Sequence, residues 1–355
     1  MEIRILDRID KNPHGQKITH FNKFKVSLKY DTVASPFYFE WLFDPDDENA
    51  INLAHVSHFH IVEVHHNGEQ LLKGYILSES FTDKSVATTN ALAGYSLPGV
   101  IEDCQIPPDI SMQFDNMTFR EIVKKILAPF AFSFTVDSSV SALMDTVFPV
   151  TQVSDGDTIK KFLTDLASQK DINITHDRYG NLLFTKVKAN LKPIAYFKRG
   201  LPGVEMSLVF NGQPLHSHIT VRKQASIDGG NAGESTVRNP YVPYVYRPKV
   251  IKQDSGDDIA TDQAARNALA EELKNIKLII KISRWDNFAT NKIFRPNNVI
   301  SVLNREIFIY EKTDFFIEAV DLEGDEKEMT ATLTCVLVEV YNGKTPQNIF
   351  TKWEQ

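Results

Sequence analysis

Residues 59–77, FHIVEVHHNGEQLLKGYIL, have the pattern of two strands joined by a tight turn. Apolar and polar side chains alternate on both sides of Asn67-Gly68, and alternation with a period of two is typical of a half-buried strand. Asn and Gly both tolerate the positive φ that a two-residue hairpin turn requires. This stretch therefore predicts a β-hairpin, and with it a sheet-based N-terminal part of the chain.

Short alternating segments continue on both sides of this hairpin. Strands are predicted at residues 24–30, 37–41 and 85–94, and no helical pattern separates them. Several short strands at this spacing are typical of a small barrel or sandwich. The 23 Phe and 11 Tyr residues also favour sheet over helix, because flat rings pack well on a pleated surface.

Helical patterns begin after about residue 107. Thr118 and Glu121 have the spacing of a capping box, and the apolar stripe that follows ends before Pro129. Asp157 is the predicted N-cap of a second helix. Each helix precedes a strand, so we predict a small α+β domain here. Its expected elements are helices at 119–128 and 158–169 and strands at 132–136, 172–176 and 182–185.

Strands return in the C-terminal half, around one long helical pattern. Residues 225–239 are polar and Gly-rich and are predicted as a loop. Residues 240–248 interleave Tyr with Pro, which indicates an extended edge. A helix is predicted over 258–276 from its Ala, Glu and Leu content. The remaining predicted strands are 205–209, 218–222, 277–283, 299–303, 307–310, 315–322 and 329–341, with a turn at 324–327.

The element order predicts an α+β chain that is mainly β, with two β modules, the second of them discontinuous. A helix-bearing insertion interrupts that second module. The predicted domains are a β module at 1–105, an α+β domain with two helix–strand units at 106–190, a second β module at 191–225 and 295–345, and an α+β insertion at 226–294.

Composition excludes several classes of protein. The 355 residues are 42% hydrophobic and 24% charged, which is typical of a globular chain. We expect no bilayer-spanning segment and no signal peptide, because the sequence lacks both patterns. The net charge of −7 argues against a protein that grips nucleic acid through its phosphates. Two cysteines, Cys104 and Cys335, indicate synthesis in a reducing compartment.

Sequence motifs of common enzymes are missing. The chain contains no phosphate-binding loop, no dinucleotide fingerprint, no nucleophile elbow and no zinc-protease helix motif. Paired catalytic carboxylates depend on spatial geometry, and nothing in the sequence points to them. We therefore predict no enzyme, no catalytic residue and no cofactor.

Histidines and acidic runs are the candidates for metal ligands. Five histidines crowd into twelve positions, namely His55, His58, His60, His65 and His66. In a strand, His58 and His60 would share one face, but a metal site needs three or four convergent ligands. A solvated strand face with a hairpin turn is the simpler interpretation, and metal binding by this cluster stays open. His216 and His218 form a second same-face pair with a weaker case.

Two acidic runs, at residues 44–48 and 254–258, lack the register of calcium loops. We interpret both as solvated loops. The second run also precedes the predicted long helix, where carboxylates favour the positive end of the helix dipole.

Several segments together resemble the baseplate hub proteins of Mu-like contractile-tail phages, the phage tail protein P family. They are GYS (94–96), VIEDC (100–104), FREIVKKILAPF (119–130), 155–166, DRYGNLLF (177–184), ITVR (219–222), and 264–273 leading to FRPNNV (294–299). That family often has Arg and Trp where this chain has Tyr95 and Phe294. The resemblance covers most of residues 90–340 and includes the T-even hub and the N-terminal part of type VI secretion spike proteins.

This resemblance implies a structural role in the virion. Such hubs are homotrimers whose subunits each carry two tail-tube-like β-barrels, so that three copies present six barrels to a hexameric tube and bind a trimeric spike. The implied partners are the spike, the tube protein or its initiator, and possible tape-measure and baseplate wedge proteins. DNA would pass through without specific binding, no membrane insertion is implied, and synthesis would occur in the bacterial host cytoplasm.

Two other functions stay open. One is a cell-wall or surface-polysaccharide hydrolase of a tail, and the other is a glycan-binding β protein with a helical insertion. For the Tyr/Pro segment 240–248, docking of a neighbouring tube, sheath or wedge protein and an ordinary edge or linker are equally plausible.

Overall fold

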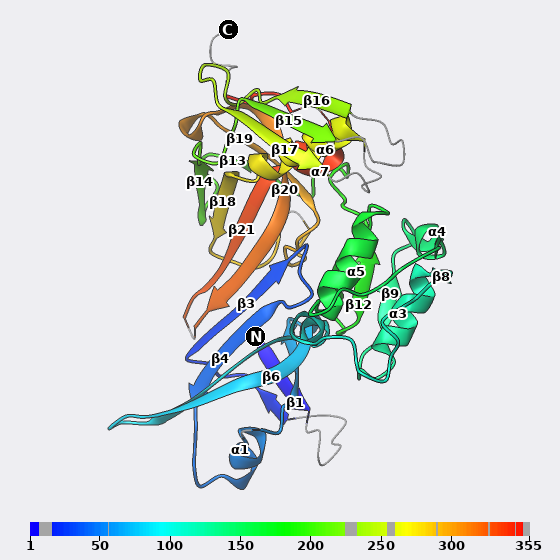
Figure 1. Ribbon diagram of the computed structural model, residues 1–355. Coiled ribbons are helices and arrows are strands. Elements are labelled where there is room, and N and C mark those ends of the chain that lie inside the picture. Colours follow the sequence, from blue (N-terminus) through cyan, green and yellow to red (C-terminus); the bar gives the residue numbers. More distant parts are fainter. Residues whose placement is uncertain are drawn as a thin grey trace. The chain divides into compact units, whose positions relative to one another are not determined.

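The computed structural model describes residues 1–6, 16–55, 57–223, 233–253, 260–288, 290–325, 327–344 and 346–350. The chain divides into two units, which are described separately. Unit 1 comprises Met1–Lys186 and Asp321–Met329, and unit 2 comprises Val187–Val320 and Thr330–Gln355. The chain is mainly β, with smaller helical parts in each unit (Figure 1).

Unit 1 begins with an antiparallel sheet. Its strands are β1 (Glu2–Leu6), β2 (Gln16–Ile18), β3 (Lys23–Lys29), β4 (Pro36–Leu42), β5 (Ile61–His66), β6 (Glu69–Asp83) and β7 (Thr88–Ser96). They run in the order β3-β4-β7-β6-β5-β1-β2. Asn67 and Gly68 have φ of 49° and 79° between β5 and β6, which confirms the predicted hairpin. Alternate side chains such as Phe39, Val62 and Val64 are fully buried, as the period of two predicts.

A short helix, α1 (Glu48–Leu53), lies between β4 and β5. The side chain of Asp47 accepts a hydrogen bond from the backbone N–H of Asn49 and so caps this helix. The prediction of a solvated loop over 44–48 is therefore wrong at its end. The acidic residues there begin a helix, because a carboxylate satisfies an otherwise unpaired amide of the first turn.

The helical part of unit 1 follows β7. Its elements are η1 (Leu97–Gly99), α2 (Val100–Asp103), β8 (Met117–Thr118), α3 (Phe119–Leu127), β9 (Phe134–Val136), α4 (Ser141–Met144), β10 (Val147–Phe148), α5 (Ile159–Ser168), β11 (Asn173–His176) and β12 (Leu182–Thr185). β12 pairs with β11 on one side and, in parallel, with β9 on the other. The apolar faces of α3 and α5 share one core with this small sheet.

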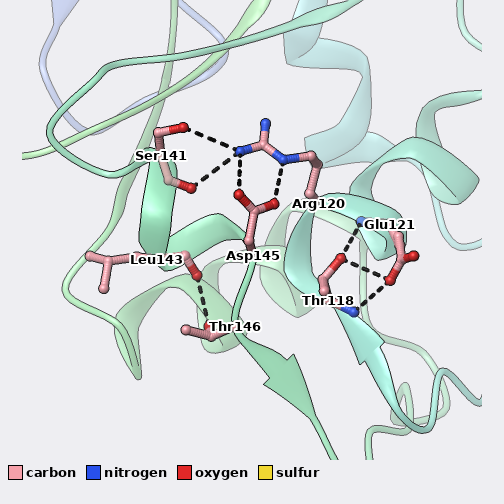
Figure 2. A network of polar contacts seen from close by, with 7 residues as sticks. All are labelled: Thr118, Arg120, Glu121, Ser141, Leu143, Asp145 and Thr146. Atoms are coloured by element: carbon pink, nitrogen blue, oxygen red, sulfur yellow. Dashed lines mark hydrogen bonds and ion pairs between the residues drawn. The ribbon is translucent and has the colours of Figure 1, made fainter.

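Local polar contacts fix the start of α3. Thr118 and Glu121 form the predicted capping box, with Thr118 N–H donating to Glu121 Oε2 at 2.8 Å (Figure 2). Arg120 donates two hydrogen bonds to the Asp145 carboxylate just after α4, at 2.7 and 3.2 Å. Such paired contacts hold two short helices in one orientation.

The N-cap of α5 differs from the prediction by one residue. Thr158, rather than Asp157, accepts the hydrogen bond from the N–H of Lys161. Asp157 instead forms an ion pair with the Lys161 ammonium at 3.2 Å. Both residue types can cap a helix, and the extended backbone of Thr158 decides which one does.

Unit 2 holds a further set of β-strands, of which only the residues within Asp321–Met329 belong to unit 1. Its strands are β13 (Tyr196–Lys198), β14 (Val204–Phe210), β18 (Ile276–Ile282), β19 (Val299–Asn304), β20 (Ile309–Gly324) and β21 (Met329–Leu337), and η2 (Arg305–Ile307) and α7 (Glu339–Asn342) accompany them. The order is β14-β18-β21-β20-β19-β13, with β13 parallel to β19. The strands predicted at 307–310 and 315–322 form one strand, β20. The last predicted strand ends at Leu337 instead of residue 341, where α7 replaces it.

A helix-backed sheet follows β14 in sequence. It contains β15 (His218–Lys223), β16 (Gly233–Arg238), β17 (Pro248–Gln253) and α6 (Thr261–Leu273), with the order β16-β15-β17. The predicted loop over 225–239 is wrong from Gly233 onward, because pairing with β15 orders these polar residues as a strand. Its earlier part, the acidic run at 254–258 and the predicted start of the long helix lie outside the described residues.

Two further expectations concern local conformation. Residues 240–247 are irregular rather than an extended edge, with a turn at 240–241 and a bend at 243–245, and a strand begins only at Pro248. Among the described segments, no helix is long and apolar enough to cross a bilayer.

Candidate functional site

A buried polar junction lies within unit 1, between the β3–β4 connection and β11. His176 Nδ1 lies 3.0 Å from the carbonyl oxygen of Asp177, and its Nε2 lies 2.6 Å from the hydroxyl of Ser35. A carbonyl oxygen only accepts, so Nδ1 donates, and in the neutral ring Nε2 accepts from Ser35. Thr175 and Asn173 donate to the carbonyl oxygens of Thr32 and Tyr30. The junction joins segments more than 140 residues apart.

The turn between β11 and β12 continues this junction. The Asp177 carboxylate accepts from the backbone N–H groups of Tyr179 and Asn181, both at 2.9 Å. Gly180 has a φ of 86°, and a Cβ there would lie 2.7 Å from Leu97, so the turn requires glycine. Arg178 forms an ion pair with Glu69 at 2.7 Å. The segment 177–184 thus positions the small sheet against the β5–β6 hairpin.

The Gly94-Tyr95-Ser96 segment has a steric role. A Cβ built on Gly94 would overlap the carbonyl oxygen of Tyr75 on the paired strand β6. The Tyr95 hydroxyl donates to Asp103 at 2.5 Å. Burial of the ring, together with the neighbouring Asp103 carboxylate, raises the pKa of Tyr95. These contacts fix the passage from β7 into α2.

The five clustered histidines do not form the expected strand face. Ser57 and Phe59 have φ of 76° and 48°, and β5 begins only at Ile61, so His58 and His60 precede the strand. The rings of His55 and His58 stack at 3.9 Å, and His60 is buried. His65 lies 3.4 Å from Glu63, and His66 is buried at the hairpin end. Within the described ranges, no group of three or more His, Cys, Asp or Glu is placed to hold a metal ion.

The two histidines of the second pair, His216 and His218, contact different partners. His216 meets Glu272 of α6, whereas the His218 ring lies 5.7 Å from Tyr246. Glu272 is 5% exposed and accepts from His216 N–H at 2.8 Å, His216 Nδ1 at 2.7 Å and Lys249 Nζ at 3.1 Å. Sequence reasoning missed this buried carboxylate, since its partners are 23 and 56 residues away.

The cysteines are placed apart. Cys335 lies fully buried on β21, and burial raises its pKa, while Cys104 is partly exposed just after α2. Burial therefore disfavours the reactive thiolate form of Cys335.

Each unit presents a strand with one unpaired edge. In unit 1, β5 pairs with β6 only as far as Tyr75, so the described part of β6 from Leu77 to Asp83 pairs with β7 alone. In unit 2, β14 pairs with β18 alone among the described strands. The side chains of Phe81 and Phe210 on these strands are 43% and 46% exposed. Unpaired edges of this kind accept neighbouring strands.

The segment 99–186 contains the polar turn and the two capped helices described above. It matches the family model described as baseplate hub protein gp44-like, second domain. This stretch of the chain is similar to that domain, and we call it the gp44-like domain. This match confirms the resemblance to baseplate hub proteins that the sequence motifs indicated. No curated protein matches the chain.

Similarity to known proteins is not limited to the gp44-like domain. Several solved structures resemble the fold of nearly the whole chain. A 43 kDa tail protein of prophage MuSo2 from Shewanella oneidensis has a TM-score of 0.78 at 18% identity, covering 96% of this chain and 100% of that protein. A tail protein of Neisseria meningitidis MC58 has 0.74 at 16%, covering 96% and 97%. The E. coli c3393 protein, a type VI secretion component, has 0.55 at 13%, covering 98% and 80%.

The gp44-like domain is therefore one part of a fold that the chain shares with these solved proteins along both units. Its junction through Ser35 and His176 attaches it to the first sheet. The buried side chains described here hold elements together. The three solved proteins named above are described as tail proteins and a type VI secretion component.

Proposed function

We propose that this chain is the central hub of a contractile-tail baseplate, in a phage or prophage. The observation that carries the proposal is the likeness to the MuSo2 tail protein along nearly the whole of both chains, together with the gp44-like domain. The likeness to the E. coli secretion component, whose description compares it with the T4 tail proteins gp27 and gp5, supports the same role.

In this role the chain is a homotrimeric symmetry adaptor. Each unit contains mostly antiparallel strands, and we propose that each unit supplies one tube-like barrel module. Three copies would then present six similar modules to a hexameric tube and a threefold face to a spike. Ring closure requires heterologous contacts between successive modules. The unpaired edges of β6 and β14 favour such contacts, because a neighbouring subunit would cover them.

We also propose that DNA passes through the hub. A trimeric ring in the baseplate would line a channel, and the net charge of −7 would repel phosphate, so that DNA slides without binding. The partners are a trimeric spike and the tube protein or its initiator, with tape-measure and wedge proteins at the periphery. The chain would act in the virion after synthesis in the host cytoplasm.

The decisive experiment is the mass in solution combined with symmetry from negative-stain images. We expect three copies of 40.3 kDa in a ring with an open centre. A monomer that no tail protein can trimerise would contradict the hub assignment. Tight DNA binding at physiological salt would contradict the proposal that DNA slides through without binding. It would not contradict the trimeric ring itself.

A further inference from the structure

The β15–β17 sheet in unit 2 has one face covered by α6 and one face exposed. Ile219 and Val221 of β15 are buried on the helix side, where Ser235 also contacts Thr261 at 2.9 Å. The opposite face is defined by the strand register, which aligns Arg238 with His218, Thr236 with Thr220 and Val250, and Glu234 with Arg222 and Lys252. We call this exposed side the outer face.

Tyr246 lies at one end of the outer face, and Tyr244 precedes it in the same loop. Tyr244 and Tyr246 are 87% and 78% exposed, and Val245 between them is 57% exposed. The Tyr246 ring lies 5.7 Å from the His218 ring, which places it next to the first row of the outer face. Large aromatic side chains this exposed are unusual on a surface that meets only water, and they dominate the energetics of protein interfaces.

The loop that carries these tyrosines is held in place. Arg247 donates to the carbonyl oxygens of Gly212 and Gln213 at 2.8 and 2.6 Å, and its backbone N–H donates to Ser217 at 2.8 Å. On the other side, the buried Tyr241 donates its hydroxyl to the Gln347 carbonyl oxygen at 2.8 Å. A loop fixed in this way loses little conformational entropy when a partner packs against its tyrosines.

The outer face is cationic in a chain that is acidic overall. Arg238 and Lys252 are exposed at opposite corners, and Arg222 pairs with Glu234 at 2.8 Å. Among its described residues, the face therefore carries two cationic side chains in addition to that ion pair, whereas the whole chain has a net charge of −7. Opposite potentials attract across an interface and set which partner binds.

We propose that the outer face with Tyr244 and Tyr246 is a docking site for an acidic protein partner. The partner presents carboxylates to Arg238 and Lys252 and an apolar side chain to the two tyrosines. Nucleic acid fits less well, because binding through phosphates needs a longer run of cations and Glu234 lies on this face. The inference stands on the surface itself and does not depend on the hub assignment.

The test uses the full chain and a display library of random peptides of about 12 residues, the length of a typical docking segment. Peptides are selected on the native chain after removal of those that bind the variant Tyr244→Ala/Tyr246→Ala/Arg238→Glu. We expect enrichment of Asp and Glu around an aromatic or leucine side chain. A selected peptide should bind the variant at least about tenfold more weakly, and the native chain several-fold more weakly at high salt.

Controls separate this result from a general effect of substitution. Phe308→Ala/Lys281→Glu makes similar changes at exposed positions elsewhere in unit 2, and it should leave peptide binding unchanged. Circular dichroism and melting temperature check that both variants fold.

Other outcomes overturn the proposal. Neutral or basic selected peptides, or none that distinguish the native chain from the variant, contradict an acidic partner. Binding of an oligothymidylate that requires Tyr244 and Arg238 would assign the face to nucleic acid. A change in the oligomeric state of the triple variant would show that the outer face forms contacts between copies of this chain.

Discussion

The hydroxyl of Ser35, just before β4, lies 2.6 Å from Nε2 of His176, at the end of β11. Ser35 is fully buried, and its backbone also exchanges hydrogen bonds with Ser96. One side chain therefore connects the first sheet of unit 1 with the gp44-like domain.

Ser35→Ala should lower the free energy of unfolding of unit 1 by about 1 kcal/mol, because it removes the donor that faces a partly buried ring nitrogen. Urea unfolding of the native chain and the variant measures the difference. Ser80→Ala is the matched control, since Ser80 is exposed on β6, and it should change stability by less than about 0.5 kcal/mol. Equal effects of the two substitutions would show that the hydrogen bond between Ser35 and His176 does not contribute to the free energy of unfolding.

Glu272→Gln should destabilise unit 2 by about 2 kcal/mol, because the buried carboxylate accepts three hydrogen bonds and an amide cannot replace them all. Its neighbour Glu271 provides the control, since its carboxylate is 69% exposed and pairs only with Lys274 in the contacts described. Glu271→Gln should cost less than about 0.5 kcal/mol. Thermal unfolding of both variants tests the prediction, which fails if the two melt together.

Gly94→Ala should prevent unit 1 from folding properly, because the new methyl group would overlap the backbone of Tyr75. The strands β6 and β7 would have to separate, and we expect low soluble yield and loss of cooperative melting. Gly233→Ala is the comparison, since the nearest atom to a Cβ there lies at 3.4 Å, an ordinary contact. A well-folded Gly94→Ala protein would refute the close approach of the two strands.

Alkaline pH should destabilise unit 1 through Tyr95. Burial raises its folded-state pKa above the value of about 10 in an unfolded chain. Its contribution is therefore fully present below about pH 10 and is lost as the pH rises toward the folded-state pKa. Urea unfolding between about pH 9 and pH 11 should show a steeper loss for the native chain than for Tyr95→Phe. Parallel pH curves for the two proteins would argue against the shift.

Local signals in the sequence predicted the elements that depend on few residues. The Asn67-Gly68 turn and the Thr118–Glu121 capping box were found because neighbouring residues determine their geometry. β16 was missed because its polar residues form a strand only through pairing with β15. The polar composition of residues 233–238 reflects their exposure to solvent. It contains no information about the strand with which they pair.

The candidate site residues also divide into those that local sequence signals predicted and those that depend on distant partners. Sequence similarity located the gp44-like domain, and the Tyr/Pro pattern drew attention to the loop at 240–248. The buried partners of Glu272 and His176 could not be predicted, since they lie far away in the sequence. Histidine density was misleading for His58 and His60, because two residues with positive φ precede β5 and break the strand.

The tip of the β20–β21 hairpin belongs to unit 1, where Asp321 accepts from Ser27 at 2.5 Å and Glu323 pairs with Lys25 at 2.8 Å. The partners in these contacts lie 294 and 298 residues apart in the sequence. A ribosome must therefore translate as far as Met329 before the first unit has all its parts. Premature termination upstream of codon 321 would leave both units incomplete, so we expect truncated products to be degraded by proteolysis.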